Sequence, residues 1–160
     1  MVPAGDGRLM AHIRIQEEPF DIAAEQARLR QGHSDIGALV SFTGIVRGDD
    51  FGKAVNSITL EHYPAMTMSE LEAIAAEAAQ RWPLKGVTII HRVGRLRAGD
   101  DIVLVLAASQ SREAAFAAAS FLMDWLKTRA PFWKAEETAA GTNWVEARAS
   151  DEDAAARWNK

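Results

Sequence analysis

The sequence contains no cysteine, and this absence excludes several kinds of chemistry. Without thiols the 160-residue chain can form no disulfide and can hold no metal through thiolate ligands. It also has no thiol nucleophile and no side chain that could carry a persulfide. Any sulfur chemistry would therefore need sulfur that another molecule delivers.

Long apolar runs and an excess of positive charge are missing as well. No run approaches the roughly 20 apolar residues that span a bilayer, and the first residues lack the apolar segment of a secretory signal. The net charge of −4 argues against a dedicated nucleic-acid-binding protein. We therefore expect a cytoplasmic protein that binds neither nucleic acid nor membranes.

Composition and length predict one globular domain over residues 1–160. Hydrophobic residues make up 48% of the chain and charged residues 25%, which is ordinary globular usage. We interpret residues 1–10 as a loose leader. Helices and strands alternate, with one hairpin predicted early and another late, so we expect an α+β fold with a mixed or antiparallel sheet.

Hydrophobic spacing and capping residues give the expected elements. Helices are expected at residues 22–30, 67–82, 112–129 and 150–158. Strands are expected at residues 12–16, 37–46, 55–62, 86–93, 101–108, 132–138 and 143–149.

Several local signals refine these predicted helices and strands. Asp21 and Ser111 are expected N-caps, and Thr67 with Glu70 has the form of a capping box. The buried side of the first helix is expected to hold Ile22, Ala23, Ala27 and Leu29. The polar segment 47–53 is interpreted as the loop of a hairpin between strands 37–46 and 55–62. Strand 101–108 is the most hydrophobic and is expected at the centre of the sheet.

The stretch LKTRAPFWK, residues 126–134, gathers cations in an otherwise acidic chain. Pro131 disfavours helical geometry at the residue before it, so Lys127 should lie on the last helical turn and Lys134 on the following strand. Two ammonium groups on different elements can converge on one anionic ligand. The alternative is that these cations only complement the helix dipole. The residues themselves leave both interpretations open.

Two arginines and one histidine also have both a functional and an ordinary structural interpretation. Arg47 lies where a strand opens into the polar loop, a position from which a side chain can reach a ligand. Arg112 opens the longest helix, where free backbone N–H groups suit a phosphate. A solvated loop arginine and an ordinary helix-start arginine remain the alternatives. His91 is interpreted as a packed strand histidine, because no second metal-type ligand is spaced nearby.

Taken together, several segments resemble the large, catalytic subunit of molybdopterin synthase. They occur in the family's order and cover most of residues 36–150. The matching runs are SFTGIVR (41–47), LEHYPAM (60–66), RWPL (81–84), VTIIHRVGRLRAGD (87–100), FLMDWLKTRAPFWKAE (121–136) and WVEAR (144–148).

The resemblance implies an α/β-hammerhead-like domain with an additional antiparallel β-rich subdomain. It also implies a homodimer, and a heterotetramer with two small ubiquitin-like sulfur-carrier subunits. The carrier's C-terminal Gly-Gly, as a thiocarboxylate, would enter a pocket of this chain. Two sulfurs would pass to cyclic pyranopterin monophosphate, giving molybdopterin, with no metal or cofactor. The lack of cysteine fits, because the sulfur arrives on the partner.

The resemblance also implies roles for particular residues. Lys127 and Lys134 match the lysines of the reaction centre. Arg47 and Arg112 match arginines of the substrate pocket. The further residues expected to bind substrate, or for the last one substrate or carrier tail, are Ile45, Val46, Ser111, Ala135, Glu136 and Arg148.

One position departs from the family pattern, which commonly has a histidine where this chain has Ser111. A serine can form hydrogen bonds but cannot titrate near neutrality. We favour a role in phosphate contact, which Ser111 could serve. A non-catalytic carrier-binding scaffold of the same fold is the alternative function, and the presence of both lysines counts against it.

Overall fold

The computed structural model describes residue 9 and residues 11–50, 52–145 and 149–159. The leader predicted over residues 1–10 lies outside these residues except for Leu9, which packs against the main hydrophobic core. None of the described helices is both long and apolar enough to cross a membrane.

The larger sheet is mixed, with the strand order β1-β6-β8-β2. Strand β1 runs parallel to β6, whereas β8 is antiparallel to both of its neighbours. The central position predicted for the apolar strand is confirmed, because β8 lies between β6 and β2. The bounds are Ala11–Gln16 for β1, Ala38–Ile45 for β2, Leu84–Arg92 for β6 and Asp101–Ser109 for β8.

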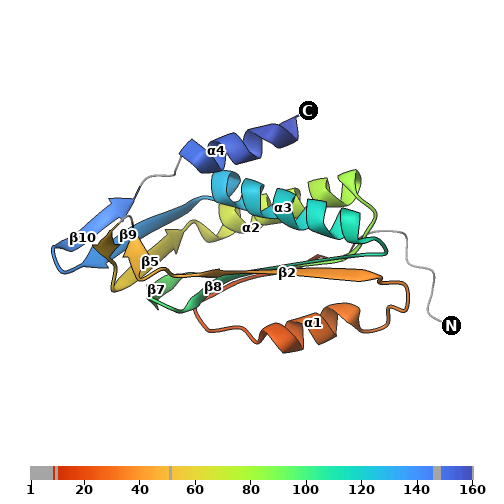
Figure 1. Ribbon diagram of the computed structural model, residues 1–160, viewed down its shortest axis with the longest axis horizontal. Helices are drawn as coiled ribbons and strands as arrows, with labels where there is room; N and C mark the ends of the chain where they lie inside the picture. Colours follow the sequence, from red (N-terminus) through yellow and green to blue (C-terminus); the bar gives the residue numbers. More distant parts are fainter. Residues whose placement is uncertain (1–8, 10, 51, 146–148, 160) are drawn as a thin grey trace.

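Helices cover this sheet on both faces (Figure 1). The helices α2 (Pro64–Arg81) and α3 (Arg112–Arg129) lie on one face, and α1 (Ile22–Arg30) lies on the other. Side chains of β8 alternate accordingly, with Val105 in the core under α2 and α3 and Leu104 in the core under α1. Because both faces of β8 are buried, its sequence is apolar at nearly every position. The last helix, α4 (Ala149–Ala156), packs on α3 and continues into a 3₁₀ turn, Arg157–Asn159.

Of the caps predicted at Asp21, Thr67 and Ser111, two are confirmed. Asp21 accepts a hydrogen bond from the Ala24 N–H at 3.0 Å, and Ser111 accepts one from the Ala114 N–H at 3.3 Å. The capping box predicted at Thr67 is wrong. Helix α2 already begins at Pro64, because proline suits the first helical position, so Thr67 lies buried inside the helix.

The smaller sheet is antiparallel, with the strand order β10-β9-β5-β7. It lies at the left of Figure 1. The late hairpin, β9 with β10, is confirmed. The bounds are Ser57–His62 for β5, Gly94–Arg97 for β7, Phe132–Thr138 for β9 and Gly141–Val145 for β10.

The predicted early hairpin is wrong. Strand β2 pairs with β8, whereas β5 pairs with β7 and β9 in the other sheet. After β2 the chain bonds to the turn before β8, through Val46 N–H to the Asp100 carbonyl and Gly99 N–H to the Val46 carbonyl. The intervening loop contains its own short ribbon of β3 (Asp49–Asp50) and β4 (Lys53–Ala54). The two strands are thereby carried into different sheets.

The first helix is held by a buried carboxylate rather than by an alanine stripe. Ile22 and Leu29 pack on the sheet as predicted, but Ala23 and Ala27 are exposed. Glu25 is buried and faces β1, because the α1 face toward the sheet meets polar side chains there.

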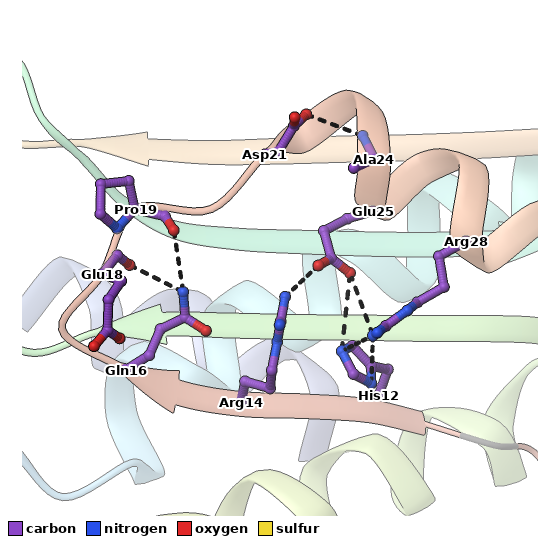
Figure 2. A network of polar contacts seen from close by, with 9 residues as sticks. All are labelled: His12, Arg14, Gln16, Glu18, Pro19, Asp21, Ala24, Glu25 and Arg28. Atoms are coloured by element: carbon purple, nitrogen blue, oxygen red, sulfur yellow. Dashed lines mark hydrogen bonds and ion pairs between the residues drawn. The ribbon is translucent and has the colours of Figure 1, made fainter.

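These polar side chains form the network of Figure 2. Glu25 pairs with Arg14, and its Oε2 lies 3.8 Å from both His12 Nε2 and Arg28 Nη1. One carboxylate thus balances the cations of two elements, α1 and β1.

We predict that Glu25→Gln lowers the free energy of unfolding by about 1–2 kcal/mol. The substitution removes the negative charge that Arg14 faces. Water compensates part of the loss, because the Arg14 side chain is 39% exposed. Urea denaturation at neutral pH measures the effect, with Glu18→Gln, an exposed position, as control. Equal stability of the two variants would contradict the assigned role of Glu25.

Candidate functional site

Helix α3 ends at the junction of the two sheets, and β9 continues from it into the smaller sheet (Figure 1). Ala130, before Pro131, has left the helix with φ −72° and ψ 127°. Lys127 therefore lies in the last turn of α3 and Lys134 in β9, as the sequence predicted.

Two aromatic rings, those of His91 and Phe132, stack on each other at this junction. The buried ring of His91, from β6, lies on the ring of Phe132 with centroids 4.0 Å apart and an interplanar angle of 20°. His91 Nδ1 lies 2.7 Å from the Arg92 carbonyl oxygen, to which an Nδ1–H donates. The prediction that His91 is a packed strand histidine is confirmed.

Electrostatics keep this histidine uncharged at neutral pH. Burial, together with the nearby charges of Lys127 and His62, lowers the pKa of His91 to about 4, against the raising effect of the Arg92 hydrogen bond. Lys127 thus acts electrostatically on this imidazole from the last turn of α3.

Lys134 lies in β9, the strand that contains the stacked Phe132. Side chains alternate along a strand, so Phe132, Lys134 and Glu136 share one face of β9. Lys134 Nζ lies 3.7 Å from Glu136 Oε1, and the lysine side chain remains 33% exposed. Both lysines thus lie at the junction of the two sheets, Lys127 at the end of α3 and Lys134 in the strand that follows it.

The end of β2 approaches this place from the side. Val46 packs in a small core with Ile58 and Leu60, which are the cross-strand partners of Glu136 and Lys134. Ile45 is 56% exposed, and Arg47 is exposed where the polar loop begins. Ala135 is buried on the opposite face of β9 from Lys134.

Ser111 and Arg112 lie far from the lysines within one copy of the chain. Lys127 follows Arg112 by fifteen positions in α3, which is about 22 Å along the helix axis. In Figure 1 the helix runs from its start at the right to its end at the left, next to the smaller sheet. One chain therefore does not unite all the predicted residues, and Arg148 lies outside the described residues.

His62, to which the sequence alone assigned no role, also lies at this junction of the two sheets. His62 ends β5 directly opposite Phe132, with ring centroids 5.9 Å apart. The LEHYPAM match contained it, but strand alternation alone does not show which face of β5 turns toward the lysines. Among the described residues, no group of three or more His, Cys, Asp or Glu side chains could hold a metal ion.

The fold and this group of side chains define a class of protein. It is an α+β protein that presents two lysines, from a helix end and a strand, at the junction of two sheets. Ammonium groups beside an uncharged aromatic stack suit the binding of an anionic group.

Comparison with known proteins gives the family. The family model described as "MoaE protein" matches residues 15–129. A molybdopterin synthase catalytic subunit from Mesorhizobium japonicum is 56% identical over 148 residues, which cover 91% of this chain and 92% of that relative. The solved structure of a molybdopterin biosynthesis MoaE protein from Burkholderia ambifaria superposes with a TM-score of 0.81 and 51% identity, covering 94% of this chain and 99% of that one.

A more distant solved structure shares the fold. It is a complex of subunits 1 and 2 of molybdopterin-converting factor from Helicobacter pylori, with a TM-score of 0.66 and 19% identity, covering 86% of this chain and 91% of that one. The chain belongs to the MoaE protein family. The predicted resemblance and the α+β fold are confirmed, and the chain is an enzyme of molybdopterin synthesis.

We predict that burial of His91 makes stability depend on pH. Its folded-state pKa of about 4 lies below the unfolded value of 6.5, so the unfolded chain binds more protons between these values. The contribution is complete above pH 6.5 and is lost as the pH falls toward 4. Between pH 7 and pH 5 the free energy of unfolding should fall by about 2 kcal/mol from this group.

Urea denaturation at the two pH values measures this loss in the wild type and in two variants. His91→Phe should remove most of the pH dependence, while His33→Phe, at an exposed position, should keep it. An unchanged dependence in His91→Phe would show that another group is responsible.

Proposed function

We propose that this chain transfers sulfur to cyclic pyranopterin monophosphate, producing molybdopterin. The two sulfurs come from the thiocarboxylated C-terminal glycine of a small ubiquitin-like carrier subunit. One observation carries the proposal: Lys127 and Lys134 arrive from different elements beside the uncharged His91–Phe132 stack. The absence of cysteine agrees with it, since the sulfur then never resides on this chain.

The lysines supply what a thiocarboxylate reaction needs. An ammonium group neutralises the anionic tail as it enters, and it stabilises an oxyanion that develops at the attacked carbonyl. Such stabilisation is stronger where aromatic rings exclude water. Glu136 accompanies Lys134 at 3.7 Å and restrains the position of its ammonium group.

The partner in this proposal is a separate small subunit. The Helicobacter pylori protein named above was solved as a complex of two subunits, and the chain's family membership supports a similar pairing here. We assign the reaction to the cytoplasm, in a heterotetramer of two copies of this chain and two carriers.

Two copies are needed because of the length of α3. A substrate that contacts the lysines cannot also reach Arg112 of the same copy, about 22 Å away along the helix. A two-fold axis removes this difficulty, since it can set the start of one α3 beside the end of the other. In this arrangement the phosphate of the substrate binds Ser111 and Arg112 of one copy and the sulfur chemistry takes place at Lys127 and Lys134 of its partner.

Strand β2 offers the edge for such pairing. It is a free edge of the larger sheet, and its 8 residues extend over about 26 Å, close to the separation along α3. Antiparallel pairing with a second β2 brings the start of one strand beside the end of the other. The first residue of β2, Ala38, pairs with Ser109, which lies just before the start of α3. The last residue of β2 is followed closely by Arg47. Exposed Phe42, Ile45 and Phe116 supply apolar surface along this edge.

We predict that Lys127→Ala lowers turnover at least about 100-fold, because it removes the charge that stabilises the reacting group. The assay contains purified chain, thiocarboxylated carrier and cyclic pyranopterin monophosphate. Lys85→Ala, which removes a lysine paired with Asp35 outside the site, should keep wild-type turnover. A wild-type chain that binds the carrier but forms no product would favour the non-catalytic scaffold instead.

We predict that inactive variants complement each other if the site is shared. Mixed dimers of Lys127→Ala and Arg112→Ala chains contain one intact site, formed by the unaltered lysine of one copy and the unaltered arginine of the other. Random exchange of subunits makes half of the dimers mixed, so activity should recover to about one quarter of wild type. Activity that stays at the level of the separate variants would mean that each site is formed within one copy.

A further inference from the structure

His62 has a buried nitrogen with no partner in the described structure. The side chain is half-buried at the end of β5, and its Nδ1 atom is shielded from solvent without a hydrogen bond. A buried polar atom left unpaired costs about 1–3 kcal/mol. Such an atom in a native protein therefore calls for a partner that arrives later, either a ligand or an ordered water.

The pairing of β5 with β9 relates His62 to Lys134. His62 lies opposite Phe132, and Leu60 lies opposite Lys134, so the histidine and Lys134 occupy diagonal positions on one face of the smaller sheet. Diagonal pairs of this kind are about 7–8 Å apart at their Cα atoms, within reach of long side chains. The charge of His62 also acts on His91, which Lys127 affects as well.

The neighbouring elements hold His62 in this place. Helix α2 begins at Pro64, two residues after it, so the backbone turns away from the sheet directly behind the imidazole. Phe132 packs against the ring from β9, and His91 lies beyond Phe132 on β6. The ring is thus packed on these sides although its Nδ1 atom makes no hydrogen bond.

We infer that His62 is a further residue of the reaction site, which donates a hydrogen bond from Nδ1–H to the terminal group of the bound carrier tail. The inference rests on the proposed function, because it takes the ligand between the lysines to be that tail. The charges around the site select an acceptor: Lys127 and Lys134 attract an anion, and Glu136 is already engaged with Lys134. A terminal carboxylate or thiocarboxylate provides the acceptor atoms that satisfy the open nitrogen.

A double-mutant cycle on carrier affinity tests this contact. The probes are the carrier ending in a Gly-Gly carboxylate and the same carrier without its last glycine. Each is titrated by calorimetry into the wild-type chain, His62→Phe and His62→Gln. Phenylalanine keeps an aromatic ring against Phe132 but has no donor, whereas glutamine restores an N–H donor. His33→Phe, at an exposed position beyond α1, is the matched control.

His62→Phe should bind the complete carrier about tenfold more weakly than the wild type does, and the shortened carrier equally well. His62→Gln should recover affinity for the complete carrier to within about threefold of wild type. Unchanged affinity of His62→Phe for the complete carrier would overturn the inference. An equal loss for both carriers would also overturn it, since His62 would then act only on the fold. If the wild type binds neither carrier, the proposed partner itself is wrong and the inference is rejected with it.

Discussion

The stacking of His91 on Phe132 joins the two sheets at the point where α3 ends. His91 belongs to the larger sheet and Phe132 to the smaller one, so the contact sets how β9 leaves the helix. It also requires an uncharged imidazole, because a buried cation here would face Lys127 without compensation. The aromatic stack, the neutral histidine and the two neighbouring ammonium groups therefore depend on one another.

The second constraint is the rigidity of α3. It keeps Ser111 and Arg112 about 22 Å from Lys127, independently of the conformation of the loops. Loops can adapt to a ligand, but a capped helix of 18 residues packed on the sheet cannot shorten. A reaction that uses both groups must therefore be organised between copies of the chain. In the assembly proposed above, the same helix serves two sites, with its start in one and its end in the other.

The parts of this structure that the sequence predicted well are those set by nearby residues. The bounds of α1 and α3 follow from caps within the same few residues, Asp21 and Ser111, and the end of α3 follows from Pro131. Strand pairing is not local, and there the prediction failed: β2 and β5 look like a hairpin until the bonds of Val46 to the turn before β8 are known. The lysines were assigned from their motif, whereas the position of His62 opposite Phe132 depends on the pairing register of β5 with β9.

The positions of the histidines help to explain how this chain can have Ser111 where the family commonly has a histidine. This residue is occupied as the N-cap of α3, bonded to the Ala114 N–H, so it offers a hydroxyl but no titratable group to a phosphate. Of the 4 histidines in the chain, His12 and His33 lie with α1, away from the lysines. His91 already donates to the Arg92 carbonyl. That leaves His62 as the imidazole with an open buried nitrogen, and it stands at the lysine end. Under the proposed function, therefore, the end of α3 that binds phosphate works through charge and hydrogen bonds alone, while the imidazole of His62 belongs to the end that receives the carrier.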